Sequence, residues 1–179
     1  VDYSRTGGEK LHIRKVTTTR SLLRACRRFL AKNPIANVLP LGDLYSPLLQ
    51  VSDVYAAVKN RHIVGVCSIY CAFSTPSIVF GTATPEVKRA LLEKALSGIS
   101  DKFISLCQPE DADLFKEYST IVHSHFEQQM IANPPKRIEC GNIKVERVSK
   151  SELESLNRFY VDHHAEAWAP IQFKAGPYY

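Results

Sequence analysis

The most constraining feature of this sequence is an apolar run of eleven residues from Ile63 to Phe73, Ile-Val-Gly-Val-Cys-Ser-Ile-Tyr-Cys-Ala-Phe. The run is rich in β-branched and aromatic residues and carries no charge, which is typical of a strand buried on both faces. A polar turn, Asn60–His62, precedes it, and a loosely alternating stretch, Asp53–Lys59, precedes the turn. The pattern predicts an antiparallel pair of strands with other elements packed onto the sheet.

The segment after this run predicts a short strand and then a helix. Ser74–Ser77 contains a proline and breaks the run, and Ser77–Phe80 is short and apolar. Thr84 is suited to cap the helix, Pro85 to the first helical position, and Glu86 to the positive end of the helix dipole. The apolar face of this helix would hold Val87, Ala90, Leu91 and Ala95, with Gly98 as its stop.

The chain before the hairpin predicts one strand and two helices. Leu11–Val16 alternates as a half-exposed strand does, and residues 1–10, polar with a Gly-Gly pair, predict a flexible lead-in. The threonines of Thr17–Thr19 can cap a helix that runs to about Lys32. A shorter helix, interrupted by prolines, is predicted between Ile35 and Gln50.

After the central helix the pattern predicts a strand over Lys102–Cys107, a helix over Pro109–Tyr118 and a closing strand over Thr120–Ile131. The two prolines of Asn133–Pro135 indicate a domain boundary. Beyond it, a strand over Ile143–Val148 and a helix starting at Ser149–Glu152 repeat the order of the first strand and helix of the chain. This echo predicts an internal duplication whose second copy has barely begun at Tyr179.

Size and charge limit the class of protein. The 179 residues suffice for one domain or one domain plus part of a second, with 45% apolar and 23% charged residues. No segment approaches the ~20 apolar residues that span a bilayer, and no signal peptide opens the chain, so we expect no membrane partner. Residues 1–34 carry a net charge of +7, whereas the overall charge is only +5. Any attraction to an anionic partner should therefore come from the N-terminal part.

The five cysteines are odd in number and loosely spaced. They predict buried free thiols in a reducing cytoplasm rather than a disulfide framework. The five are Cys26, Cys67, Cys71, Cys107 and Cys140.

The predicted order, β-α-α-β-β-β-α-β-α-β, resembles the GNAT acetyltransferase fold, an α+β fold with a mixed, mostly antiparallel sheet flanked by helices. Short sequence segments resemble proteins with two tandem GNAT units. These segments are Phe29–Leu44, the pair Val54–Val58 and Ile63–Tyr70, and Phe173-x-x-Gly176-x-Tyr178. The resemblance implies a nearly complete N-terminal unit over residues 11–135. Residues 136–179 would then form a linker and the truncated beginning of a second unit.

The resemblance also implies where a cofactor would bind. A catalytic GNAT unit carries Arg/Gln-x-x-Gly-x-Gly/Ala between its central strand and the following helix, and this loop cradles the pyrophosphate of acetyl-CoA. The corresponding residues here are Gly81, Thr82, Ala83 and Thr84, followed by Pro85 and Glu86. One glycine, a proline without an amide donor and a carboxylate predict a degenerate phosphate loop.

Other candidate residues have weaker patterns. His123 and His125 would share one face of a strand, but a metal site needs three or four ligands, so we expect no metal. The His163–Glu166 stretch lacks the spacing of a zinc protease. Tyr118, Tyr160 and Glu127 are possible acids or bases without an assigned role, and Trp168 is expected to serve packing.

Two functions remain open from the sequence. The first is an acetyl-CoA-dependent N-acyltransferase that acts on an unidentified small-molecule or protein amine in the cytoplasm, with catalysis mainly in the second unit. The first unit would then cover the substrate site, form a homodimer or hold the second unit in place. The alternative is a non-catalytic GNAT-like interaction domain. Its partner would be a protein or, through the arginines of the predicted helix ending at Lys32, a nucleic acid.

Overall fold

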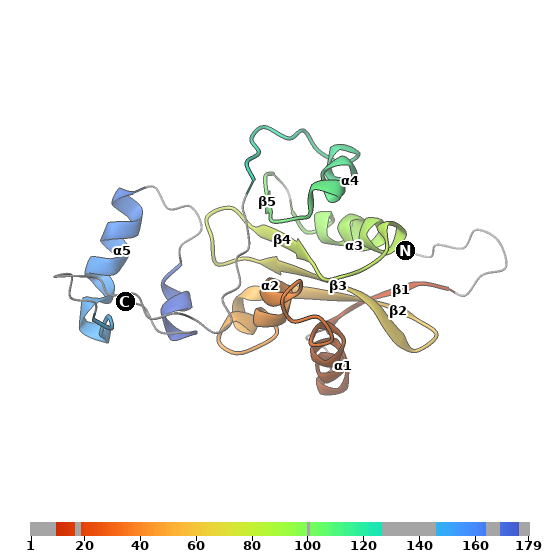
Figure 1. Ribbon diagram of the computed structural model, residues 1–179, viewed down its shortest axis with the longest axis horizontal. Helices are drawn as coiled ribbons and strands as arrows, with labels where there is room; N and C mark the ends of the chain where they lie inside the picture. Colours follow the sequence, from red (N-terminus) through yellow and green to blue (C-terminus); the bar gives the residue numbers. More distant parts are fainter. Residues whose placement is uncertain (1–9, 17–18, 100, 127–145, 164–168, 176–179) are drawn as a thin grey trace.

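A five-stranded sheet forms the centre of the fold in a computed structural model of the protein (Figure 1). The structure describes residues 10–16, 19–99, 101–126, 146–163 and 169–175. The strands lie in chain order: β1 (His12–Lys15), β2 (Ser52–Lys59), β3 (His62–Tyr70), β4 (Ser77–Phe80) and β5 (Ile104–Ser105). The first three junctions are antiparallel, and β4 pairs with β5 in parallel. The predicted α+β class with a mostly antiparallel sheet is confirmed.

The hairpin that organises the sheet is present where the apolar run predicted it. Lys59 faces His62 across a two-residue turn, in which Asn60 and Arg61 have φ angles of 51° and 64°. Both angles lie in the left-handed region, which matches the twist of a tight hairpin but is unfavourable for an arginine. In β3, every residue from Gly65 to Tyr70 is buried, so the strand is covered on both faces, and it ends three residues before Phe73.

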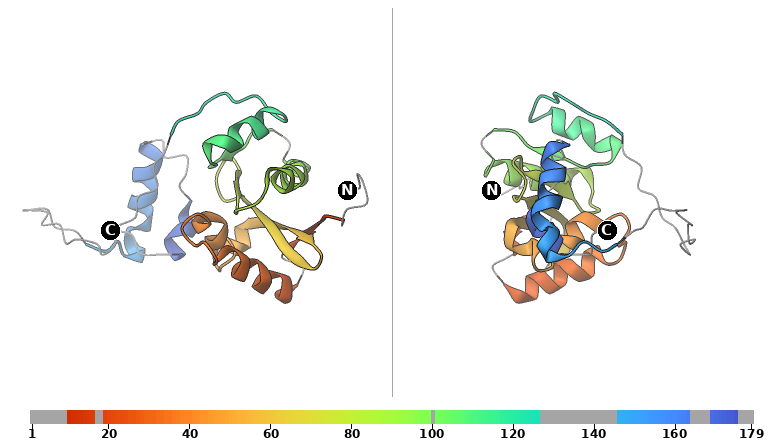
Figure 2. Two further views of the ribbon diagram at one scale, coloured as in Figure 1. Left: turned by 45° about the vertical axis from the view of Figure 1, so that its right-hand side comes forward. Right: turned by 90° about the vertical axis from the view of Figure 1, so that its left-hand side faces the viewer.

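Helices cover both faces of the sheet. The helices α1 (Arg20–Leu30) and α2 (Val38–Gly42) lie on one face, and α3 (Pro85–Leu96) and α4 (Ala112–Lys116) lie on the other (Figures 1 and 2). Alternation along the strands feeds both cores, because neighbouring strand residues point to opposite faces. On the α1 side the core contains Leu22, Cys26, Leu30, Val54, Ala56 and Val66. On the α3 side it contains Ala57, Cys67, Ile69, Ile78, Leu91 and Phe115.

Several predicted elements are shorter than expected or absent. The predicted strand over Lys102–Cys107 is reduced to β5, and the predicted helix over Pro109–Tyr118 is split into a 3-10 turn (Pro109–Asp111) and α4. The expected helix between Ile35 and Gln50 is likewise divided into α2 and a second 3-10 turn (Leu48–Val51). Pro47 separates α2 from the 3-10 turn after it, as its missing amide donor requires, whereas Pro109 stands at the first position of the other segment and does not account for its division.

The predicted closing strand over Thr120–Ile131 is wrong where the structure describes it. Residues 120–126 form no regular element, and Val122 and Phe126 are 94% and 90% exposed. No described strand edge pairs with this segment, so its alternating side chains have no buried face to fill. Residues 127–131 lie outside the described part of the chain.

The C-terminal part contains a capped helix. A short 3-10 turn (Lys150–Glu152) leads into α5 (Leu153–Asp162), so helical structure begins where the sequence predicted it. Glu152 accepts a hydrogen bond from the Ser149 backbone amide at 2.8 Å, which caps this start. A further 3-10 turn (Pro170–Lys174) packs against α5. Residues 146–148 are not in a strand, so the described end of the strand predicted over Ile143–Val148 is wrong.

Two ion pairs join α3 to the α4 region, and they differ in burial. Lys88 Nζ donates to both carboxylate oxygens of Asp111 at 2.7 and 2.6 Å, and the two side chains are only 13% and 10% exposed. Arg89 contacts Glu117 with two similar bonds of 3.1 and 2.7 Å, but these side chains are 43% and 48% exposed. Both ion pairs therefore have two charge-assisted hydrogen bonds, but the Lys88–Asp111 pair is shielded from water and the Arg89–Glu117 pair is not.

We expect Asp111→Asn to lower the free energy of unfolding by about 1.5–3 kcal/mol, because it weakens charge-assisted hydrogen bonds and leaves the Lys88 ammonium shielded without its counter-charge. The matched variant Glu117→Gln should lower the free energy of unfolding much less than Asp111→Asn does, since water screens the exposed pair. Urea unfolding of both variants measures the difference. Equal losses in the two variants would contradict the role of burial.

Candidate functional site

The link between β4 and α3 is the candidate phosphate-binding position. It consists of Gly81, Thr82, Ala83 and Thr84, at the carboxyl end of β4 and directly before the first turn of α3. Gly81 is buried, whereas Thr82 and Thr84 are exposed. The structure thus places the predicted residues together at a helix N-terminus that could, by its position, receive an anion.

Asn37 occupies the inner side of this link. Its carboxamide oxygen accepts the backbone amide of Thr82 at 2.8 Å and the Thr82 hydroxyl at 3.2 Å. Its amide nitrogen donates to the carbonyl oxygen of Leu30 at 3.0 Å, at the end of α1. The Gly81 amide is also in use, because it donates to the Val66 carbonyl at 2.8 Å. Two amides of the link are therefore directed at protein acceptors and not outward.

The glycine of this link serves packing. A Cβ atom at Gly81 would lie 2.5 Å from Cδ2 of Leu30 and 3.4 Å from Oδ1 of Asn37. Such a methyl group would collide with the side chain of Leu30 on α1, which would have to shift within the core to make room. In a phosphate loop, a glycine instead lets the backbone approach the ligand.

The first turn of α3 adds a negative charge. Pro85 stands at the first helical position, as predicted, and has no amide to donate. The carboxylate of Glu86 accepts hydrogen bonds from the Glu86 backbone amide and from the Thr84 hydroxyl. These bonds lower the pKa of Glu86, so the carboxylate is ionised at neutral pH. The expected side-chain cap by Thr84 is wrong, because the Thr84 hydroxyl bonds the carboxylate of Glu86 and makes no cap hydrogen bond. The carboxylate would repel a phosphate at this helix end.

A buried carboxyl group that the sequence did not single out lies beside α2. Asp43 is 7% exposed, and the hydroxyl of the fully buried Ser68 on β3 donates to its Oδ2 at 2.5 Å. Burial raises the pKa of Asp43, and the hydrogen bond from Ser68 opposes that shift. The pair ties α2 to the sheet. Both residues lie in segments that carry the family resemblance, but they are 25 positions apart, so no local signal could have shown that they pair.

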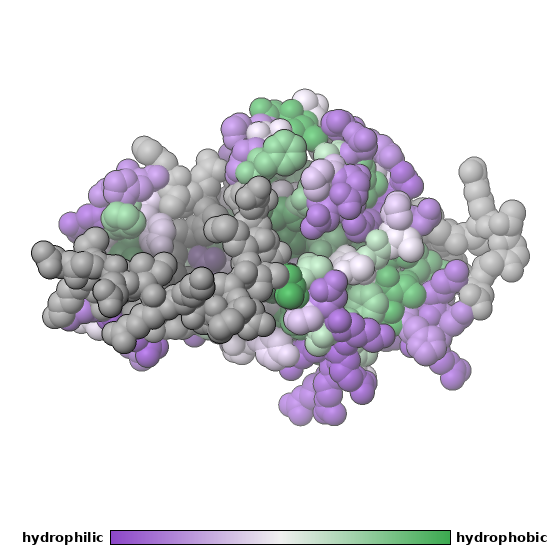
Figure 3. Space-filling model, in the orientation of Figure 1, coloured by the Kyte–Doolittle hydropathy of each residue, from purple (hydrophilic) through white to green (hydrophobic). Residues whose placement is uncertain are grey.

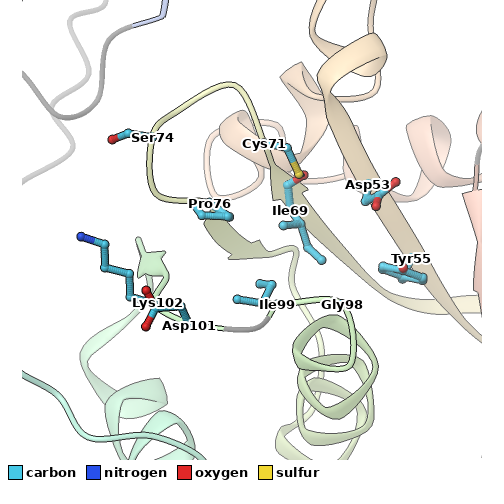
Figure 4. Close-up of a pocket in the computed structure, with 10 residues that line it drawn as sticks. All are labelled: Asp53, Tyr55, Ile69, Cys71, Ser74, Pro76, Gly98, Ile99, Asp101 and Lys102. Atoms are coloured by element: carbon cyan, nitrogen blue, oxygen red, sulfur yellow. The ribbon is translucent and has the colours of Figure 1, made fainter.

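A small cleft of about 240 Å³ lies at the opposite end of β4 (Figure 4). Asp53, Tyr55 and Cys71 line one wall and Lys102 the other, and Asp53 also contacts Lys15 at 2.5 Å. Partial desolvation by the walls of the cleft, followed by the negative charge of Asp53, raises the pKa of the Cys71 thiol, although the residue as a whole is exposed. A protonated thiol is a poor nucleophile, so the cleft holds no activated group of that kind.

The prediction of buried thiols is only half correct. Cys26 and Cys67 are buried and free, and burial raises the pKa of Cys26 to about 12. Cys71 and Cys107 are also free but exposed, because the strands expected to contain them end before they are reached. Cys140 lies outside the described residues.

The other candidate groups are dispersed. His123 and His125 have ring centroids 5.6 Å apart but lie in the exposed, irregular segment 120–126 and not on a strand. The hydroxyl of Tyr118 donates to Glu93 at 2.7 Å, and desolvation together with this bond raises the pKa of Tyr118 to about 12. Tyr160 lies on α5 against the ring of Phe159.

His163 ends α5, whereas Glu127, His164, Glu166 and Trp168 lie outside the described residues. Within the described ranges, no three His, Cys, Asp or Glu side chains gather as metal ligands would, and no helix is long and apolar enough to cross a membrane.

No protein-family model and no curated protein matches the chain. Among solved structures, an aminoglycoside N-acetyltransferase in complex with CoA is similar at 13% identity over 75% of this chain and 100% of that one, with a TM-score of 0.42. An acetyltransferase from Trypanosoma brucei is similar at 13% identity over 68% and 99%, with a TM-score of 0.45. A ribosomal-protein-alanine N-acetyltransferase from Brucella melitensis biovar Abortus 2308 is similar at 11% identity over 69% and 99%, with a TM-score of 0.41. These similarities assign no role to any residue of this chain.

Proposed function

We propose that the chain belongs to an acetyl-CoA-dependent N-acyltransferase of GNAT type and that residues 11–135 are its degenerate, non-catalytic unit. The non-catalytic role rests on one observation: in the link after β4, the backbone amides of Gly81 and Thr82 already donate to acceptors within the protein. Asn37 holds the Thr82 amide at 2.8 Å, and the carboxylate of Glu86 lies at the helix end. The residues present therefore do not fit the pyrophosphate of acetyl-CoA, and no catalytic step is assigned to this unit.

The chemistry of acyl transfer supports this division. An amine that attacks a thioester must lose a proton, and the departing thiolate must gain one, so a catalytic unit needs a positioned base and acid. Near the link, Glu86 is the nearest ionised group in sequence, and its carboxylate is engaged with Thr84. Tyr118, with a pKa of about 12, is bonded to Glu93 and is poorly suited to protonate a thiolate at neutral pH.

The proposal assigns catalysis to a second unit that residues 136–179 would begin. The described part of this region supports it through α5, whose Phe159 and Val161 are 55% and 62% exposed. A capped helix with large exposed apolar side chains is suited to pack against further structure. The acceptor would be a small-molecule or protein amine, and the first unit would cover the substrate site, dimerise or support the second unit. The occupied link equally suits a purely non-catalytic interaction domain, which is the second candidate.

Thermal unfolding with about 1 mM acetyl-CoA tests the proposal. If the link bound the cofactor with a Kd of about 10 μM, the chain would gain ~2.7 kcal/mol and its Tm would rise by about 5–10 °C. We expect no increase for this chain, because the amides of Gly81 and Thr82 are occupied.

An increase in Tm of that size would overturn the non-catalytic role of the unit. A longer form of the protein, if the gene encodes one, separates the two candidates. An increase in Tm and acetyl transfer to amines there would support the acyltransferase, and the absence of both would favour the interaction domain.

A further inference from the structure

A groove of about 950 Å³ opens on the α1 side of the sheet, away from the link after β4. Its walls are β1, the beginning of α1 and the turn between β2 and β3, and its floor contains Val58 and Ile63. His12 and Arg14 are alternate residues of β1, so both side chains point to this face. The groove therefore joins residues from three separate parts of the sequence.

All charged side chains of the groove are basic. Lys10 and Arg14 come from the β1 region and Arg61 from the hairpin turn, and no Asp or Glu lines the groove. Arg14 and Arg61 are exposed, and no acidic side chain in the described part of the chain pairs with either. Unpaired cations around a concave surface focus a positive potential, which attracts anions.

The helix whose first turns line the groove also carries a row of arginines on its solvent face. Arg20, Arg24 and Arg28 are exposed and four residues apart, which places them about 6 Å from one another along the helix axis. Figure 3 shows hydrophilic side chains along the lower edge of the molecule, where Figure 1 places α1. Arg27 is different, because it donates to the Leu44 carbonyl at 3.1 and 2.5 Å and lies 4.2 Å from the Tyr45 ring centroid. Arg27 thus fixes α1 to the chain after α2, and the other three arginines face solvent.

We propose that the groove and this arginine row bind the phosphate backbone of a nucleic-acid duplex without reading its bases. A duplex carries about one charge per 1.7 Å of its axis, and a row of regularly spaced cations is complementary to such a polyanion. No Phe, Tyr or Trp lines the groove, so single-stranded bases would find no stacking platform. The net charge of +7 within residues 1–34 gives the surface its long-range attraction. This inference does not depend on the acyltransferase proposal.

Salt dependence is the quantitative test. If about four cations contact phosphates, the slope of log K against log[salt] should be about −4, so affinity should fall by on the order of 10²-fold between 50 and 200 mM NaCl. We would measure fluorescence anisotropy of a labelled duplex DNA of arbitrary sequence, about 20 base pairs long. Arg14→Gln and Arg24→Gln should each reduce the magnitude of the slope by about 1 and weaken binding to any duplex sequence.

Arg61→Gly separates binding from folding. Arg61 has a φ angle of 64°, a conformation that glycine adopts without strain, so the variant should be at least as stable as the parent chain while binding the duplex more weakly. Arg158→Gln on α5 is the matched control: it removes the same charge from a side chain near Glu154, far along the chain from the groove, and should leave binding unchanged. A loss of affinity with Arg158→Gln equal to that with Arg14→Gln would overturn the site. Tighter binding of a single strand, or equal binding of poly-glutamate, would overturn the proposed partner.

Discussion

Gly65→Val should destabilise the chain by about 3 kcal/mol or more, because the side chain has no room against α3. A Cβ atom at Gly65 would lie 2.5 Å from Cγ1 of Val87, 3.0 Å from Cβ of Ala83 and 3.2 Å from Cδ1 of Leu91. Overpacking a buried site commonly costs about 1–3 kcal/mol, and the two further methyl groups of valine increase the collision. Urea unfolding, with the free energy extrapolated to water, measures the loss.

Gly42→Ala is the matched control for this variant. A Cβ atom at Gly42 meets nothing within 4 Å, so alanine should be neutral or stabilise by up to about 1 kcal/mol through the unfolded chain. The collision itself can be tested by adding Val87→Ala to Gly65→Ala, which removes the closest atom. The two changes should then cost less together than the sum of their separate costs. A Gly65→Val variant as stable as the parent chain would mean that β3 and α3 are not in this close contact.

The elements around Gly65 could be predicted from sequence because their signals are local. The apolar run fixes β3, its polar turn fixes the hairpin, and Pro85 with Glu86 marks the start of α3. The closing strand over Thr120–Ile131 had an equally good alternation, yet Val122 and Phe126 are almost fully exposed in it. A strand also needs a free edge beside it, and alternation in one segment carries no information about distant edges.

The candidate site was predictable in part for the same reason. The single glycine, the proline and the glutamate of the link are visible in the sequence as departures from a phosphate loop. The role of Asn37 is not visible in the sequence, because its partner Thr82 lies 45 residues further along the chain. The basic groove is intermediate: the charge of residues 1–34 is visible in the sequence, but only the fold brings Arg61 from the hairpin turn beside Arg14.

Asn37→Ala should lower the free energy of unfolding by about 2–4 kcal/mol. The side chain is 2% exposed, and its loss removes the bonds to the Leu30 carbonyl and to the Thr82 amide at once. Buried groups that lose their partners cost about 1–3 kcal/mol each, and the Leu30 carbonyl sits where α1 ends against the core. Urea unfolding of Thr82→Val is the control, since it removes only the 3.2 Å hydroxyl contact at an exposed residue and should cost within about 0.5 kcal/mol.

Asn37→Ala also shows which feature of the link prevents phosphate binding: the hydrogen bond from the Thr82 amide to Asn37, or Pro85 and Glu86 at the start of α3. Asn37→Ala frees the Thr82 amide but leaves Pro85 without a donor and the Glu86 carboxylate ionised at the helix end. We therefore expect no increase in its Tm with about 1 mM acetyl-CoA, at a temperature range where the variant is folded. If acetyl-CoA stabilised Asn37→Ala but not the parent chain, Asn37 alone would block the link, and the repulsion assigned to Glu86 would be too weak to matter.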